Sequence, residues 1–70
     1  METKTGHILG QNVAAIRTRQ NLSKSQFCLM ASISRPYLDL VESGSSNITL
    51  EKLDSLAESL GVEPWELIHP

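Results

Sequence analysis

The sequence predicts an all-α domain of five short helices. Apolar residues recur every three or four positions in several windows, which is the spacing of one face of a helix. They nowhere alternate with a period of two over a useful length, so no sheet is expected. Serine and threonine caps, prolines and glycines divide the chain into segments with short connections, as in a helical bundle. With 70 residues and 40% apolar content, the chain can build one small core.

The first helix is expected from Ile8 to Arg19, because apolar residues recur there at helical spacing. Its apolar stripe consists of Leu9, Val13 and Ile16. The helix should end before Asn21. Residues 1–7 are then expected to form a flexible N-terminal arm, and residues 8–70 to form the folded domain.

The second helix is expected over Lys24–Ala31. Ser23 stands three residues before Gln26, which is the pattern of a capping box at a helix start. The side chains expected to face inward are Phe27 and either Met30 or Ala31.

The third helix is expected over Arg35–Glu42, after the short connection Ser32-Ile33-Ser34. Ser34 is its expected cap, and Pro36 lies in the first turn, where a missing N–H is tolerated. Gly44 is expected to end it in a left-handed conformation. Two short helices joined in this way form a helix-turn-helix, whose second helix can enter the major groove of DNA.

The fourth and fifth helices complete the domain. Thr49 is expected to cap a helix over Leu50–Leu60, which Gly61 ends. Pro64 then opens a short helix over Pro64–Ile68.

The charge of the chain is unevenly distributed. A net charge of −2 by itself argues against binding to nucleic acid. However, residues 1–38 carry five basic residues and one acidic residue, a balance of +4, whereas residues 39–70 carry one basic and seven acidic residues, a balance of −6. The basic half could therefore meet phosphates, and chance in a short chain is the alternative explanation.

Several classes of function are disfavoured. Cys28 is alone, so neither an internal disulfide nor a multi-cysteine zinc site can form, which fits a reducing cytosol and a cytoplasmic protein. His7 and His69 lack ligand spacing, so no metal is expected. No segment has the length of a membrane span or the apolar core of a signal peptide. No catalytic set or glycine-rich phosphate loop is present, so neither an enzyme nor a cofactor is expected.

Two strings carry a family resemblance: LSKSQFCLMASISRPYLDLVESG at residues 22–44 and NITLEKLDSLAESLGVEPWELI at residues 47–68. They resemble the five-helix, lambda-repressor-like DNA-binding domain of phage repressors and Cro-like (Xre-type) regulators, over roughly residues 10–68. The shared marks are Arg17, Ser23, Glu42 before Gly44, and the Leu-Ala-x-x-Leu-Gly-Val run at 56–62.

The chain departs from the family pattern at four positions. Lys24 stands where the family often has a phosphate-contacting glutamine, and a lysine can keep that role as a point charge. Ser32 replaces the usual turn glycine, which requires it to adopt a left-handed or similar conformation. Cys28 replaces a small alanine at the helix crossing. Leu40 occupies a position that commonly reads bases, where it could touch only a thymine methyl group or nothing.

The resemblance implies a set of DNA contacts. Bases would be read by exposed residues of the third helix and its cap: Ser34, Arg35, Tyr37 and Leu40. Arg35 is the strongest candidate, because its fork matches the two acceptors of guanine. Tyr37 could equally be part of the core. Asp39 is expected to turn aside, with a contact to cytosine as the alternative. Phosphates would be contacted by Lys24, Ser25 and the neutral loop with Ser45, Ser46 and Asn47, giving weak, salt-sensitive binding by one monomer.

Other residues have expected structural roles. By the resemblance, Arg17 and Glu42 form an ion pair that fixes the third helix to the first, with a phosphate contact by Arg17 as the alternative. Trp65 could cap the core or belong to an apolar patch that mediates dimerisation. The interface candidates are Trp65, Leu67 and Ile68. A twofold dimer would present two recognition helices about 34 Å apart.

The leading interpretation is therefore a sequence-specific DNA-binding transcriptional regulator, a repressor or controller that acts as a homodimer on a palindromic operator of double-stranded DNA. The alternative is a protein-interaction module of the same fold, such as an antitoxin component whose acidic half binds a partner protein. The acidic half and the neutral loop favour the alternative, whereas Lys24 and Arg35 favour DNA.

Overall fold

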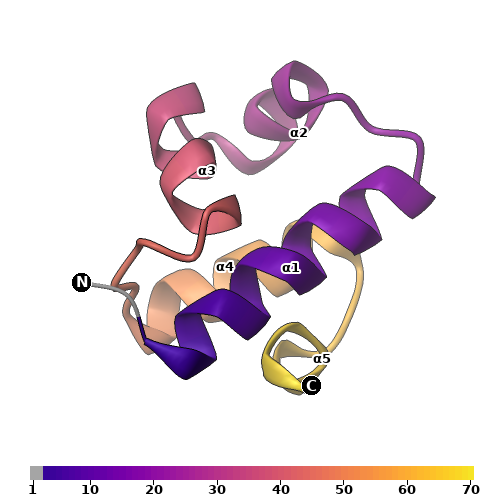
Figure 1. The fold of residues 1–70 in the computed structure, drawn as a ribbon. Coiled ribbons are helices and arrows are strands. Elements are labelled where there is room, and N and C mark those ends of the chain that lie inside the picture. Colours follow the sequence, from indigo (N-terminus) through magenta and orange to yellow (C-terminus); the bar gives the residue numbers. More distant parts are fainter. Residues whose placement is uncertain (1–2) are drawn as a thin grey trace.

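The computed structural model describes residues 3–70, and this range forms five α-helices with extents of 27 × 23 × 20 Å. The helices are α1 (Lys4–Arg19), α2 (Lys24–Ala31), α3 (Arg35–Glu42), α4 (Leu50–Leu60) and α5 (Pro64–Ile68). The long helix α1 crosses the molecule, with α2 and α3 on one side and α4 and α5 behind and below it (Figure 1). The predicted all-α fold and the predicted bounds of α2 to α5 are confirmed. Within residues 3–70, no helix combines the length and the apolar character needed to cross a membrane.

The start of α1 differs from the prediction. The helix begins at Lys4 instead of Ile8, so residues 4–7 belong to it and the predicted arm over residues 1–7 is too long. Residues 1–2 lie outside the described residues. The Oγ1 of Thr3 accepts a hydrogen bond of 2.9 Å from the backbone N–H of Gly6, which caps the first turn. Because residues 4–7 lack an apolar stripe, periodicity could not reveal this turn.

The caps predicted for α2 and α3 are present. Ser23 Oγ accepts from the backbone N–H of Gln26 at 3.0 Å, and Gln26 Oε1 accepts from the backbone N–H of Ser23 at 2.8 Å, which completes the capping box. Ser34 Oγ accepts from the backbone N–H of Tyr37 at 3.2 Å. Ser32 adopts the left-handed conformation, with φ of 56°, that its replacement of glycine required.

Polar side chains of α1 and of the residue that follows it close the C-terminal ends of the last two helices. Gln20, which follows α1, donates from Nε2 to the carbonyl oxygen of Leu60 at 2.7 Å. Asn12 donates from Nδ2 to the carbonyl oxygens of Leu67 at 3.0 Å and His69 at 2.8 Å. These bonds satisfy carbonyls that a helix end leaves without a partner. They tie α4 and α5 to α1, which also packs against α3.

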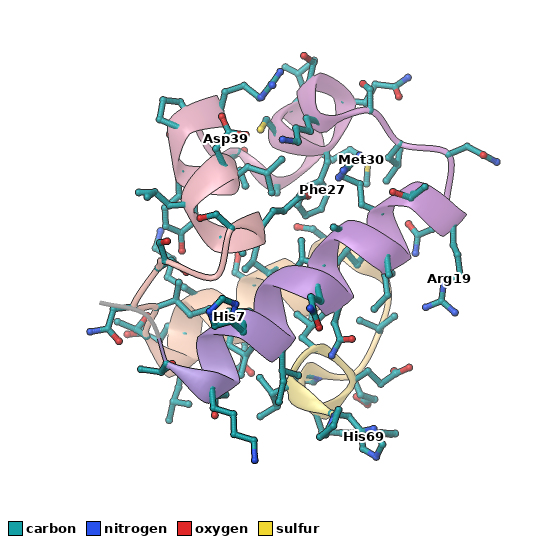
Figure 2. The ribbon with its side chains drawn as sticks, in the orientation of Figure 1. His7, Arg19, Phe27, Met30, Asp39 and His69 are labelled. Atoms are coloured by element: carbon teal, nitrogen blue, oxygen red, sulfur yellow. The ribbon has the colours of Figure 1, made fainter. Side chains whose placement is uncertain are left out.

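The core lies where the helices meet and is made of aliphatic side chains, one phenylalanine and Cys28. Its largest fully buried side chains are Phe27, Leu38, Leu67, Val13 and Val41. Phe27 lies between α2 and α1 (Figure 2). Of the two alternatives at the end of α2, Ala31 packs against the core, while 52% of Met30 is exposed.

Candidate nucleic-acid interface

The turn between α2 and α3 sets the direction of α3. After Ser32 turns into the left-handed region, the backbone N–H of Ile33 donates to the carbonyl oxygen of Cys28 at 3.1 Å. Ile33 packs against the core, and Cys28 is itself buried, so the corner of the turn is held from inside. The turn therefore gives α3 a fixed direction relative to α2.

The helix α3 is anchored along one side and open along the other. Leu38 and Val41 are fully buried, and they fix the helix to the scaffold. Ser34 is exposed, as are half of the Arg35 side chain and 52% of Leu40. The helix α3 and its cap therefore present accessible side chains along one side, as a helix must do in order to enter a groove.

Four side chains of α2 and α3 lie together and are called here the α2–α3 charge cluster: Lys24, Ser25, Arg35 and Asp39. The Nζ of Lys24 donates to Asp39 Oδ1 at 3.0 Å. The Nε of Arg35 lies 4.0 Å from the same oxygen, and its Nη1 lies 3.4 Å from Ser25 Oγ. The structure thus brings three predicted DNA contacts into one group.

Asp39 lies on the side of α3 toward α2, away from α1 (Figure 2), and is bound to Lys24. The expectation that it turns aside from DNA stays a prediction. The hydrogen bond from Lys24, supported by the positive charges of Lys24 and Arg35, holds the pKa of Asp39 below its ordinary value of 3.8. The contact between Arg35 and Asp39 had a signal in the sequence, because residues four positions apart face each other on a helix.

Tyr37 is half-buried, and its ring packs against the core. Its hydroxyl is buried and has no hydrogen-bond partner among residues 3–70, and burial raises the pKa of this phenol above 10.0. The Nζ of Lys52 lies 5.8 Å from the ring centroid. Of the two alternatives, the geometry favours partial core, because the hydroxyl is shielded from any base or phosphate.

The loop between α3 and α4 carries no basic residue. Ser45 and Ser46 are half-buried, and the Oγ of Ser46 is buried with no partner among the described residues. The prediction that the Ser46 side chain contacts phosphate therefore conflicts with its inward orientation. Asn47 is exposed and remains a candidate phosphate contact. The loop begins at Gly44, whose φ of 82° confirms the predicted left-handed stop.

The predicted pair of Arg17 and Glu42 is present and fixes α3 to α1. Arg17 Nε donates to Glu42 Oε2 at 2.7 Å, and Nη2 donates to Oε1 at 3.2 Å. The third nitrogen, Nη1, donates to the carbonyl oxygen of Leu22 at 2.8 Å. Only 13% of the Arg17 side chain and 9% of the Glu42 side chain are exposed. Because all three guanidinium nitrogens bond within the chain, the geometry favours the structural role over a phosphate contact.

The three interface candidates on α5 have different environments. Leu67 is fully buried in the core, so it cannot form part of a surface, and its assignment to the interface was wrong. Trp65 is 60% exposed and stands nearly edge-on to the ring of His69, with 5.8 Å between the centroids. Ile68 is 37% exposed. The accessible candidates are therefore Trp65 and Ile68, and Trp65 does not cap the core.

The fold and the site define a helix-turn-helix protein. Among residues 3–70, no three His, Cys, Asp or Glu side chains gather in a way that could hold a metal ion. The accessible features are instead the open face of α3 and the basic side chains beside it. Residues 13–67 match the family described as Helix-turn-helix (HTH_3), and the chain belongs to this family.

Known relatives include regulators of similar size. The chain is 29% identical over 62 residues to control protein C.BamHI of Bacillus amyloliquefaciens, covering 87% of this chain and 76% of that protein. Among solved structures, the hypothetical transcription factor NHTF from Neisseria superposes with a TM-score of 0.90 at 25% identity, covering 96% of this chain and 77% of that one.

The restriction-modification controller protein C.AhdI from Aeromonas hydrophila superposes with a TM-score of 0.82 at 32% identity, covering 89% and 94% of the two chains. These similarities agree with the Xre-type resemblance of the sequence. The chain is a DNA-binding transcription regulator of the helix-turn-helix family.

Proposed function

We propose that the chain binds a palindromic DNA operator as a homodimer, with the N-terminal half of α3 in the major groove, and there acts as a repressor or controller of transcription. The observation that supports this most directly is the accessibility of Arg35 at the start of a firmly anchored α3. A guanidinium fork in this position can donate to both N7 and O6 of a guanine. Leu40 could add an apolar contact to a thymine methyl group.

Other residues would position the protein without reading sequence. Lys24, Ser25 and Asn47 are the accessible candidates for phosphate contacts. The loop after α3 supplies no positive charge, so the affinity of one monomer should be low and strongly salt-dependent. A second copy bound to the other half-site would double the number of DNA contacts without relaxing the sequence preference. A dimer is therefore part of the proposal.

The dimer is supported by the exposed apolar side chains of α5. Trp65 is 60% exposed and Ile68 37%, three positions apart on the same helix. A twofold axis through such a patch would form an isologous contact. It would have to place the two α3 helices about 34 Å apart, one turn of DNA. Similarity to a control protein and a restriction-modification controller supports a controller role in particular.

The proposal is tested by selecting bound fragments from random DNA and measuring the stoichiometry of the complex. The expected result is an inverted repeat bound by two chains. Arg35→Ala should weaken operator binding by about 1–3 kcal/mol and relax the preference at one position of each half-site. Arg19→Ala is the matched control, because this exposed arginine ends α1 on the side away from α3 (Figure 2).

A protein-interaction module is the second candidate. The observation that favours it is the acidic face of α4, where Glu51, Asp54 and Glu58 are exposed and lie near Met30 of α2. If no fragment is selected, and if any DNA binding is insensitive to salt and to Arg35→Ala, the operator proposal is wrong. The protein-interaction function would then be the better explanation.

A further inference from the structure

The side chains that would approach DNA in the proposed function already share an anion within the chain. Lys24 Nζ lies 3.0 Å from Asp39 Oδ1, and Arg35 Nε lies 4.0 Å from the same oxygen. The exposed fractions of the three side chains are 38% for Lys24 and 50% each for Arg35 and Asp39. The carboxylate is therefore at the surface, on the helix that would enter the groove.

This carboxylate occupies the position that a phosphate oxygen would take beside Lys24 and Arg35. A phosphate that approaches either cation must compete with Asp39 for it and also meets the repulsion of the carboxylate charge. Two cations with one shared anion present a net charge of +1, where the two cations alone would present +2. The cluster is thus less attractive to a polyanion than its basic residues suggest.

We propose that Asp39 is a specificity-determining residue, which acts as the internal counter-anion of Lys24 and Arg35 and selectively weakens binding to DNA of arbitrary sequence. Binding to arbitrary sequence depends almost entirely on phosphate charge. Operator binding also includes hydrogen bonds to base edges, which depend less on phosphate charge. Removing the carboxylate therefore strengthens binding to DNA of arbitrary sequence more than binding to the operator.

The distances indicate which cation is released at an operator. Lys24 holds Asp39 by a hydrogen bond of 3.0 Å, whereas Arg35 has only a contact of 4.0 Å to Asp39 and one of 3.4 Å to Ser25. The weaker contacts of Arg35 are the ones that a guanine edge, with two acceptors, can replace. Asp39 and Ser25 thus hold the guanidinium group of Arg35 in place until a guanine replaces them.

The test compares Asp39→Asn with the wild-type chain on a duplex of random sequence, at about 50 and about 200 mM salt. The variant should bind this duplex about tenfold more tightly at the lower salt, with a log–log salt slope steeper by about 0.9, the value of one added phosphate contact. Affinity for the selected operator should rise by less, about threefold, so the ratio of specific to non-specific affinity falls.

Two controls separate this role from a general change in charge. Asp54→Asn removes the same charge from an exposed position on α4, outside the cluster, and should change binding to the random duplex by less than about twofold. In a Lys24→Met background, Asp39→Asn should have a smaller effect, because one of the two released cations is missing. The melting temperature of each variant checks that the fold is intact.

Three outcomes would overturn the inference. One is an equal effect of Asp39→Asn and Asp54→Asn on the random duplex. Another is loss of operator affinity together with a lost cytosine preference, since Asp39 would then read a base directly. A third is no binding of either chain to the random duplex. The proposed function is judged separately, by whether the wild-type chain selects an operator, so a failure there leaves the comparison on random DNA valid.

Discussion

Arg17 and Glu42 face each other in a two-pronged ion pair that joins the last turn of the first helix to the last residue of the third. The two hydrogen bonds measure 2.7 and 3.2 Å, and the remaining guanidinium nitrogen bonds to the carbonyl oxygen of Leu22. A planar fork opposite a carboxylate fixes orientation as well as distance. The pair therefore specifies how α3 sits on the scaffold, and hence the direction in which Arg35 is presented.

Replacing Arg17 by Met should lower the free energy of unfolding by about 3 kcal/mol, because Glu42 would keep a nearly buried charge without its partner. The double variant Arg17→Met, Glu42→Leu should lose less than the sum of the two single variants. Urea unfolding monitored by the fluorescence of Trp65 measures each value. Arg19→Met serves as the exposed control and should change stability by less than about 0.5 kcal/mol. A loss below about 1 kcal/mol for Arg17→Met would contradict this role.

Gly10 lies where α1 packs closely against the C-terminal end of α3. A Cβ atom there would lie 2.5 Å from the carbonyl oxygen of Val41 and 2.8 Å from that of Glu42, both of them backbone atoms. Gly10→Ala should therefore destabilise the chain by about 2–3 kcal/mol, although alanine favours a helix interior by about 1 kcal/mol over glycine. Thermal and urea unfolding would measure the loss.

Gly61→Ala is the informative comparison for that variant. Nothing lies within 4 Å of the added Cβ, but φ is +70°, so only backbone strain of about 1 kcal/mol is expected. Gly10→Ala should thus be the more damaging substitution. If it were instead neutral or stabilising, α1 and α3 could not be as close as they are in this structure.

The sequence predicted the parts of the fold that local chemistry determines. The bounds of α2 to α5 followed from caps such as Ser23, Ser34 and Thr49, whose partners lie three residues away. The start of α1 was missed because residues 4–7 have no apolar stripe. The helix there depends on the Thr3 cap and on contacts with a distant part of the chain.

The candidate site was less predictable, because its contacts join residues that lie far apart in the sequence. The family resemblance implied Lys24 and Arg35 as DNA contacts, but not that Asp39 lies between them. The burial of the Ser46 and Tyr37 oxygens likewise depends on how neighbouring elements pack. The Arg17–Glu42 pair was predicted only because the family resemblance supplied the pairing, since a spacing of 25 residues has no local signature.

The buried hydroxyl of Tyr37 gives a third prediction. Because it has no hydrogen-bond partner among the described residues, Tyr37→Phe should leave the free energy of unfolding unchanged or raise it by about 1 kcal/mol. The ring keeps its packing in the variant, so no cavity forms. Urea unfolding near neutral pH measures the difference, and Tyr37→Ala is the control that should be strongly destabilised by the loss of the ring. A loss of more than about 1 kcal/mol in Tyr37→Phe would reveal a hydrogen bond to the hydroxyl.

The pH dependence of the same variant follows from the raised pKa. The phenol loses its proton at lower pH in the unfolded chain than in the folded one, so its ionisation does not lower the stability of the fold below pH 10.0, and stability falls as the pH rises from there through the folded-state pKa. Tyr37→Phe lacks this group. The stability difference between wild type and variant should therefore shift in favour of the variant above pH 10.0.

The last prediction concerns the ionisation of Asp39 itself, which can be measured without DNA. Its pKa, followed by NMR of the side-chain carboxyl carbon, should lie below 3.8 in the wild-type chain. Lys24→Met should raise the pKa of Asp39 back toward its ordinary value by more than Arg35→Met does, because the hydrogen bond from Lys24 is the largest cause of the lowering. The depressed pKa means that the stabilising contribution of this pair is present above pH 3.8 and is lost as the pH falls through the folded-state pKa.

A high salt concentration should move the pKa of Asp39 part of the way back, since the cluster lies at the surface and its charges are screened. The test has a definite failing result: if Lys24→Met leaves the pKa of Asp39 where it was, the 3.0 Å contact does not persist in solution. Asp39 could then not be the internal counter-anion of the two basic residues, and their full charge would be available to DNA of any sequence.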